Sequence, residues 1–339
     1  MNQIKISDVT MKQTAEGFSL SFKEKIELSK LLDKLGVDLI ELEGIQNPRI
    51  DSLRIKSIAA AVKDSAIAVP VELNKDSVQR TWEALQQAKR PRLQVCAPVS
   101  SVQMEYLFHK KPEAMLKAID ETIGACRALC ADVEFVADDA TRSEMAFLVQ
   151  ALQTAISAGA TTVTLCDTAG TMLPAEFAGF VKELYAALPA LQDVTLGIGC
   201  TNTLSMADAC AVAAVSQGAG QIKAAAYTLD NVNLVNIARL LAAKADSLGV
   251  SCNVRVTQLS RASEQIAWLC QGNKAMGAKA ASSDADRIDL TMHDDISAVS
   301  KAVAKEETVL VLPAPRITEM ILPFASPKGK LKILVMPLS

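Results

Sequence analysis

The sequence predicts a (β/α)₈ barrel with a short carboxy-terminal extension. Short apolar runs alternate with longer stretches of helical period, and eight such strand–helix units fall within residues 1–248. The units also have similar lengths, which favours closure into a barrel over a doubly wound open sheet, the structural alternative.

Four strand–helix pairs are predicted in the first half of the barrel. The first helix, Ser21 to Leu35, should end at Gly36, because glycine readily adopts the left-handed conformation found at helix ends. Asp51 is expected to cap the second helix. In order, we predict a strand at 4–9, a helix at 21–35, a strand at 39–42, a helix at 51–63, a strand at 66–71, a helix at 76–89, a strand at 93–97 and a helix at 112–129.

The second half repeats this rhythm. Gly159 and Gly218 are expected to end two of its helices. In order, we predict a strand at 133–137, a helix at 143–158, a strand at 162–166, a helix at 174–188, a strand at 194–198, a helix at 204–217, a strand at 221–227 and a helix at 232–248.

Residues 249–339 break the rhythm and form the predicted extension or linking subdomain. Within it, Gln271 to Asp284 is expected to be a mobile loop and Asp294 to Lys305 a short amphipathic helix. Apolar runs and four prolines follow Thr308, and we assign them no structure. A tail this apolar is unfavourable in free solution, so we expect a homodimer.

Composition excludes several classes of protein. The net charge is −3, with no basic patch, so we expect no nucleic-acid partner. No run of about 18 apolar residues and no signal peptide occur, which predicts a cytoplasmic protein without a membrane partner. The eight cysteines are scattered, and we expect reduced thiols.

Polar residues follow the predicted strands, where the chemistry of such barrels is located. Each is also compatible with an ordinary loop role. They are Asp8, Lys12, Glu41, Glu43, Ser100, Gln103, Asp138, Asp139, Arg142, Asp167, Thr168, Thr201 and Asn202.

Three local sequences carry a resemblance to a known family. Residues 134–143, EFVADDATRS, resemble the SAEDATRSD stretch of isopropylmalate and homocitrate synthases. Residues 165–170, LCDTAG, with Pro174, resemble their DTVG…P motif. Residues 199–207, GCTNTLSMA, occupy the place of HCHNDLGLA. The resemblance covers residues 4–248, and it places the chain near the TIM-barrel metallolyases that are similar to HMG-CoA lyase.

The resemblance implies an acyltransferase of amino-acid biosynthesis that condenses acetyl-CoA with a 2-oxo acid. A divalent Mg, Mn or Zn ion holds the 2-oxo acid in this family and polarises its ketone as a Lewis acid. Its ligands are an Asp after the first strand and two His after the seventh, and an Arg beside that Asp neutralises the developing alkoxide.

This chain departs from that pattern at the ligand positions. The first-strand motif DTTLRDGEQ is DVTMKQTAE here, so Lys12 replaces the Arg and Gln13 the ligand Asp. Gly199 and Thr201 replace the two His, and Gln103 stands where the family often has another His. Neutral amide and hydroxyl oxygens are weak ligands, so we predict no resident metal and no other cofactor.

Three functions remain open. The first is a divergent member that binds a small carboxylate, or runs metal-free carbon–carbon chemistry; whether it is an enzyme stays uncertain. The second is an active synthase with an atypical metal site, and the third a non-catalytic partner of a true synthase. A 2-oxo acid and acetyl-CoA are the possible ligands. The predicted catalytic residues are Lys12, Asp8 and Glu41, and the predicted substrate-binding residues are Ser100, Gln103, Asp139, Arg142, Thr168, Thr201 and Asn202.

Overall fold

A computed structural model describes residues 1–13, 18–106, 108–281, 319–325 and 331–337. The chain divides into two compact units, Met1–Lys274 and Ala275–Ser339, which are described separately. The predicted functional division, a barrel at 1–248 and an extension at 249–339, stays a prediction.

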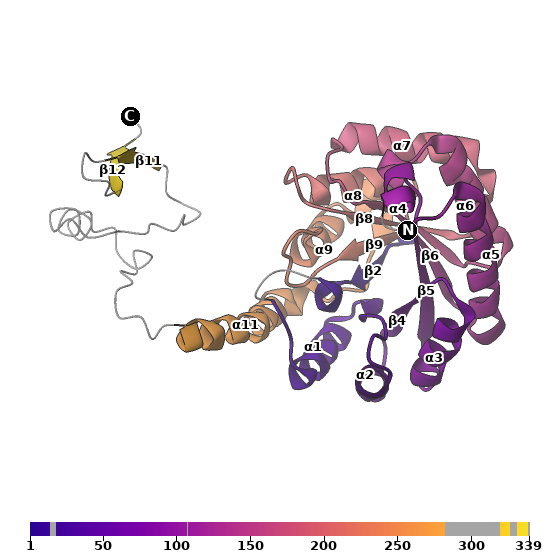
Figure 1. The fold of residues 1–339 in the computed structure, drawn as a ribbon, viewed down its shortest axis with the longest axis horizontal. Helices are drawn as coiled ribbons and strands as arrows, with labels where there is room; N and C mark the ends of the chain where they lie inside the picture. The colour runs from indigo at the N-terminus through magenta and orange to yellow at the C-terminus, as the bar shows by residue number, and fades with distance from the viewer. Residues whose placement is uncertain (14–17, 107, 282–318, 326–330, 338–339) are drawn as a thin grey trace. The chain divides into compact units, whose positions relative to one another are not determined.

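Eight parallel strands close into a barrel, as the sequence predicts, and Figure 1 looks along it. The last strand pairs with the first, with Asp8 opposite Ala224. The strands are β2 (Lys5–Asp8), β3 (Leu39–Glu41), β4 (Ala66–Val71), β5 (Pro91–Pro98), β6 (Val133–Asp138), β7 (Thr162–Asp167), β8 (Thr195–Cys200) and β9 (Gln221–Ala224).

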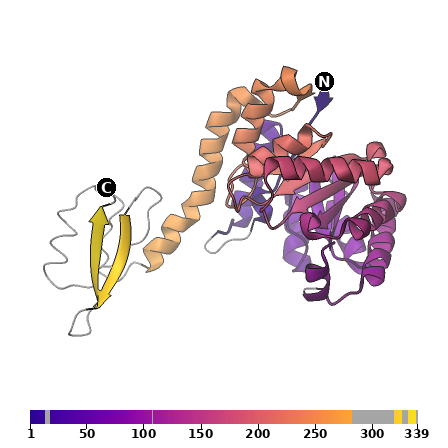
Figure 2. The same ribbon diagram turned by 90° about the horizontal axis from the view of Figure 1, so that it is seen from above.

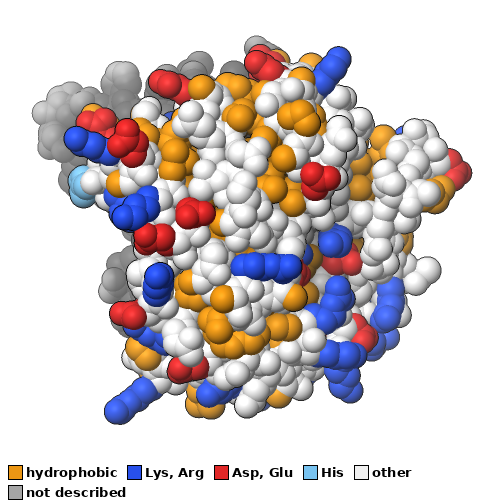
Figure 3. All heavy atoms as spheres, turned by 90° about the vertical axis from the view of Figure 1, so that its right-hand side faces the viewer, with side chains coloured by type: hydrophobic (Ala, Val, Ile, Leu, Met, Phe, Trp, Pro, Cys, Tyr) orange, Lys and Arg blue, Asp and Glu red, His pale blue; other side chains and the backbone are white. Residues whose placement is uncertain are grey.

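Helices surround the barrel (Figure 1). One large apolar cluster fills the layer between strands and helices. The helices are α1 (Phe22–Leu35), α2 (Pro48–Ala61), α3 (Lys75–Leu85), α4 (Ser101–Tyr106), α5 (Pro112–Leu129), α6 (Met145–Ser157), α7 (Pro174–Ala187), α8 (Ala207–Val215), α9 (Leu234–Ala243) and α10 (Ala245–Leu248). Short 3₁₀ turns are η1 (Thr10–Lys12), η2 (Ala140–Arg142) and η3 (Pro189–Asp193). On the face in Figure 3, acidic and basic side chains are interspersed with apolar ones.

The ends of the first two helices follow from local chemistry. Ser21 caps α1 in a reciprocal capping box with Glu24, and Gly36 ends it with a φ of 86°. The predicted cap of α2 is wrong. Asn47, followed by Pro48, caps this helix, while the Asp51 carboxylate accepts the backbone N–H groups of Gln46 and Asn47 from inside the first turn.

Two later helices are shorter than predicted. The helix expected from Leu204 begins at Ala207, because the Asn202 side chain accepts the Ala207 N–H and Ser205 has a φ of 58°. The helix expected from Val232 to Leu248 is interrupted at Lys244, which separates α9 from α10.

The first unit continues beyond α10. Strand β10 (Val250–Ser251) pairs in parallel with β1 (Asn2–Gln3), and the long helix α11 (Val256–Ala281) follows (Figure 2). Its buried residues recur at helical spacing: Leu259, Ala262, Ile266 and Cys270. The mobile loop predicted from Gln271 is therefore wrong as far as Ala281, and residues 282–284 lie outside the described chain.

In the second unit the structure describes an antiparallel pair of strands. Strands β11 (Glu319–Ala325) and β12 (Leu331–Pro337) pair with Leu322 opposite Leu334. The helix predicted at 294–305 lies outside the described residues.

Candidate active site at the barrel mouth

A hollow of about 410 Å³ opens where the barrel strands end. Of the polar residues predicted at the strand ends, Lys12, Glu41, Asp167, Thr168 and Thr201 line it, together with the family ligand positions Gln13 and Gly199. Lys223 and Asp138 also line the hollow, and neither was among the predicted catalytic or binding residues.

Glu41 is the charged centre of this mouth. Its side chain is fully buried, and its Oε2 accepts a bond of 2.9 Å from the Lys12 ammonium. Its Oε1 accepts from Ser7 Oγ at 2.7 Å and from the Lys223 ammonium. Burial would raise the pKa of Glu41, but the two ammonium groups outweigh burial and lower it, so Glu41 is ionised at neutral pH.

A second buried carboxylate lies one layer deeper. Glu134 Oε1 lies 3.0 Å from Lys223 Nζ and accepts from Thr164 Oγ1 at 2.6 Å. Its Oε2 accepts from Gln94 Nε2 at 2.7 Å, and Arg92 lies 3.6 Å away. The barrel interior is therefore a connected network of charged groups.

Lys223 is the residue that sequence reasoning missed. It lies in β9, where Gln221 and Lys223 point to the interior and Ile222 packs in the apolar layer. Burial alone would lower its pKa, but Glu134 and Glu41 raise it, so Lys223 stays protonated. The period-two alternation of this strand was the signal available in the sequence.

Gln13, at the family's ligand position, holds a loop in place. Its Nε2 donates to the Tyr227 carbonyl at 2.6 Å, and its Oε1 accepts from Leu229 N at 2.9 Å and Asn231 Nδ2 at 3.0 Å. An amide performs both roles, whereas a carboxylate only accepts. The segment after β9 is therefore fastened to the segment after β2.

At the second ligand position, Gly199 leaves room for neighbouring side chains. A Cβ there would lie 3.4 Å from Lys223 Cδ and 3.5 Å from Cys166 Sγ, so the lysine stem fills the adjacent space. Thr201, the third position, forms a bridge with Asn231, and its N–H donates to the Asp167 carbonyl.

Asp8 lies at the end of β2 but does not line the hollow. Its carboxylate accepts the N–H and hydroxyl of Thr10 and the Ala226 N–H, at 2.8–3.0 Å. Burial nevertheless raises the pKa of Asp8 to about 7. Asp8 therefore joins the two ends of the barrel seam.

A second group of predicted residues forms its own cluster after β5 and β6. Asp139, in the left-handed conformation with a φ of 60°, accepts from Ser100 Oγ at 2.5 Å and Arg142 Nε at 2.7 Å. Its N–H donates to Thr168 Oγ1, and the Gln103 N–H donates to Ser100. Most of the hydrogen bonds that these residues make therefore lie within the cluster itself.

Two more residues complete the predicted set. Asp167 accepts from Thr141 Oγ1 at 2.7 Å and from the Gly170 N–H at 3.2 Å. The Asn202 N–H donates to the Asp230 carbonyl, so Asn202 connects the loops after β8 and β9. Asp167 was predicted only to lie at a strand end, and the binding roles predicted for Asn202 and for the cluster after β5 and β6 remain predictions.

The cysteines near the mouth are not reactive thiolates. Burial raises the pKa of Cys96 to about 12 and that of Cys166 well above its usual value. Cys200 belongs to the apolar layer outside the barrel, as strand alternation predicts. Asp138 lies beside Cys166, and burial raises the pKa of Asp138 to about 6.

The mouth does not fit the family's divalent ion. Gln13 is hydrogen-bonded to the loop after β9, Gly199 has no side chain, and the aliphatic stem of Lys223 occupies the space beside Gly199. Within the described residues, no three His, Cys, Asp or Glu side chains gather as a metal site.

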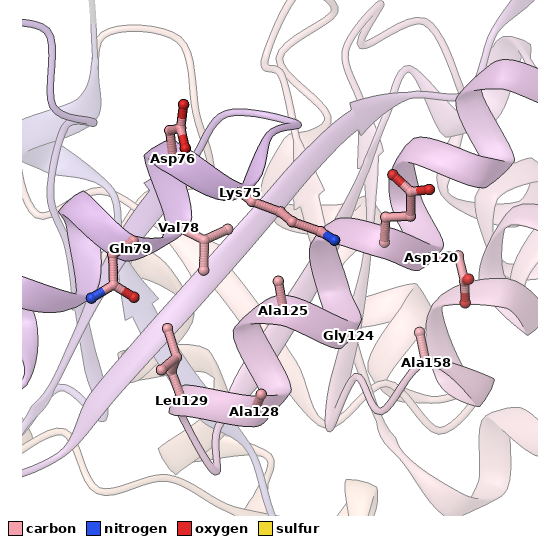
Figure 4. A pocket seen from close by; sticks show the side chains of 11 residues that line it. Lys75, Asp76, Val78, Gln79, Asp120, Gly124, Ala125, Ala128, Leu129 and Ala158 are labelled. Atoms are coloured by element: carbon pink, nitrogen blue, oxygen red, sulfur yellow. The ribbon is translucent and has the colours of Figure 1, made fainter.

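A second, larger hollow lies among the outer helices. Its volume is about 730 Å³, and α3, α5 and the end of α6 line it. Figure 4 shows its small residues Gly124, Ala125 and Ala128 along α5, with Lys75 and Asp120 near them. It includes none of the strand-end residues.

Comparison with known proteins agrees with the barrel and its motifs. A 2-isopropylmalate synthase of Pelotomaculum thermopropionicum is 31% identical over 287 residues, which cover 82% of this chain and 57% of the relative. One from Caulobacter vibrioides is 31% identical over 288 residues, covering 82% and 55%. The chain thus spans little more than half the length of these relatives.

Solved structures share the fold. HMG-CoA lyase of Brucella melitensis superposes with a TM-score of 0.64 and 17% identity, covering 80% of this chain and all of that one. HMG-CoA lyase of Acinetobacter baumannii, solved with coenzyme A and 3-methylmalate, gives 0.63 and 13%, covering 85% and 98%. The family model described as HMGL-like matches residues 3–266, and the chain belongs to this HMGL-like family.

Proposed function

We propose that the barrel mouth binds a small carboxylate of the 2-oxo acid class and that the chain does not perform metal-dependent condensation with acetyl-CoA. The donor set supports the second part, since a ketone here would meet ammonium groups in place of a dication and a guanidinium.

The observation that carries the proposal is the position of Lys12. Its side chain lines the hollow and is 25% exposed. Two of its three N–H groups reach described residues, Glu41 at 2.9 Å and Gln94 at 3.2 Å. The third is available to an acceptor in the hollow.

The protonation state of Lys12 suits an anion. Burial lowers its pKa, but the charge and the hydrogen bond of the Glu41 carboxylate raise it, and the net shift is upward. Lys12 is therefore an ammonium donor at neutral pH, and not a free amine that would attack a carbonyl. Thr168 and Thr201 line the same hollow and are proposed as hydroxyl partners of the ligand.

Binding is tested by calorimetric titration of 2-oxoisovalerate and 2-oxoglutarate into the native protein, Lys12→Met and Lys30→Met. Lys30 lies on α1 with its side chain 50% exposed, and its loss removes the same charge outside the mouth. We expect binding by the native protein and Lys30→Met and at least a tenfold loss in Lys12→Met, about 1.4 kcal/mol. Equal binding by all three would contradict the proposal.

Condensation is tested by following thiol release from acetyl-CoA with each 2-oxo acid, with and without Mg²⁺, Mn²⁺ or Zn²⁺. We expect none above background. Metal-stimulated turnover that depends on the 2-oxo acid would instead favour an active synthase with an atypical metal site.

A cytoplasmic homodimer is a further proposal. In the described residues no helix is long and apolar enough to cross a membrane. Light scattering tests the oligomer, and a clean monomer near 36.1 kDa would contradict it.

A further inference from the structure

Two buried carboxylates converge on one cation inside the barrel. Lys223 Nζ bonds Glu41 Oε1, from β3, and lies 3.0 Å from Glu134 Oε1, from β6. Both carboxylates are fully buried, and the lysine side chain is only 8% exposed. Ser7 and Thr164 hydroxyls donate to the same two oxygens and fix their positions. We call this arrangement the two-carboxylate seat.

We propose that the ammonium group of Lys223 is a tethered cation that fills the two-carboxylate seat and thereby keeps divalent ions out of the mouth. The inference deepens the proposed metal-free function and rests on it. The replaced ligand positions alone would explain weak metal binding, whereas this inference assigns the exclusion of metal to a residue that is present, Lys223.

Charge balance supports this role. Removal of Lys223 leaves two cations, Lys12 and Arg92, with four carboxylates, because Arg92 faces Glu134 at 3.6 Å and pairs with Asp132. The four carboxylates are Glu41, Glu134, Asp138 and Asp132. That excess of two negative charges matches a divalent cation. Carboxylate oxygens and water are also the ligands that Mg²⁺ and Mn²⁺ prefer.

The backbone beside the seat is fitted to the lysine. Lys223 Cδ lies 3.4 Å from where a Cβ at Gly199 would be. A methyl group at 199 would reach ordinary contact, but an imidazole would require the lysine stem to move. Gly199 and Lys223 therefore act together, since the absence of a side chain at one position gives room to the other.

The experiment measures Mn²⁺ bound in equilibrium dialysis, together with the shift in Tm that Mn²⁺ causes. The key variant is Lys223→Ala, which empties the seat. Lys12→Ala is the matched control, because it removes the same charge from the same mouth while Lys223 still fills the seat. In the double variant Lys223→Ala/Glu134→Gln, the seat is emptied but has lost one carboxylate.

We expect Lys223→Ala alone to bind close to one Mn²⁺ per chain and to melt at a higher Tm when Mn²⁺ is present. The native protein, Lys12→Ala and the double variant should bind Mn²⁺ at least tenfold more weakly. If Lys223→Ala is unfolded without metal, Mn²⁺ should restore its cooperative melting. Mn²⁺ binding by Lys12→Ala as tight as by Lys223→Ala, or no Mn²⁺ effect on Lys223→Ala, would overturn the inference. Because the readout is metal and not carboxylate binding, its failure is distinguishable from failure of the proposed function.

Discussion

The two sides of the barrel mouth differ in how they relate to the family sequence. After β6 and β7, the chain retains the family-like stretches. Asp139 accepts a bond from Arg142 of its own loop, and Asp167, at the end of β7, accepts one from Thr141 in the loop after β6. On the adjoining side, formed by β8, β9 and β2, the ligand positions have changed. There, Gln13 fastens a loop and Lys223 fills a charged seat.

The two sides show that a side chain in a family-like stretch is not necessarily free to contact a ligand. The retained side chains are largely satisfied by one another and shape the loops, as buried polar groups must be. The changed side holds the cations that face the hollow, Lys12 and Lys223. A motif that survives in sequence therefore need not present a free functional group.

The largest expected effect comes from the charged centre of the changed side. Glu41→Gln leaves the buried Lys223 and the partly buried Lys12 without their shared counter-ion, and it should destabilise the fold by about 3–5 kcal/mol. Urea unfolding measures the change. Glu43→Gln is the control, because Glu43 pairs with Lys25 and Arg54 while 39% exposed, and its loss should cost no more than about 1 kcal/mol. An equal loss of unfolding free energy in both variants would show that the ion pairs of the mouth stabilise the fold no more than those of the surface.

Asp8 should make the barrel seam sensitive to pH. Its pKa is raised by burial from 3.8 to about 7, so its contribution to stability is fully present below about pH 4 and is lost as pH rises through 7. Between pH 5 and 8 this loss is about 2–3 kcal/mol.

Urea unfolding at pH 5 and pH 8 checks this. Asp8→Asn should be less stable at both pH values, because its amide N–H group would face backbone N–H groups that now donate to the Asp8 carboxylate. The variant should also lose the part of the pH dependence that comes from Asp8. The lowered pKa values of Glu41 and Glu134 place their titration below this window. An unchanged pH dependence in the variant would place the sensitivity elsewhere, with Asp138 the next candidate.

Much of the fold was predictable because the barrel repeats a local pattern. The strand at 66–71 and the helix at 112–129 have the predicted bounds, since apolar periodicity and Pro112 define them locally. Helix α11 was missed throughout: no element was predicted at 256–270, and a loop was predicted from Gln271, where the sequence is polar with Gly and Ala. The buried residues of its described part, Leu259, Ala262, Ile266 and Cys270, recur at spacings of three and four and were detectable in the sequence.

The site was less predictable, because its key contacts join distant parts of the chain. Lys12, Glu41 and Asp138 could be placed at strand ends from the sequence. The alternation around Lys223 in β9 indicates which side of the strand it faces, but it does not identify the groups that Lys223 meets there. Its role depends on Glu41, 182 residues away, and becomes apparent only when the barrel closes.

Gln13 offers a milder test of the changed side. Gln13→Glu keeps the shape but replaces the N–H donor to the Tyr227 carbonyl with an acceptor, which should cost about 1–2 kcal/mol. The same substitution at exposed Gln153 should change stability by less than about 0.5 kcal/mol. Thermal melts of both variants measure the difference. A Gln13→Glu protein as stable as the control would show that the loop after β9 does not depend on this amide.

The smallest effect is expected on the retained side, at Arg142. Its side chain is 51% exposed, and its one ion pair, within the described residues, joins Asp139 at 2.7 Å. Arg142 does not line the hollow, whereas Lys12 lines it and has an N–H to spare. Arg142→Ala should therefore leave the Tm near the native value and weaken 2-oxo acid binding by less than about threefold, because exposed ion pairs contribute little. Calorimetric titration beside Lys12→Met makes the comparison direct. A loss at Arg142 as large as that at Lys12 would mean that the retained side also contacts the ligand, and the division of the mouth drawn from its hydrogen bonds would then be wrong.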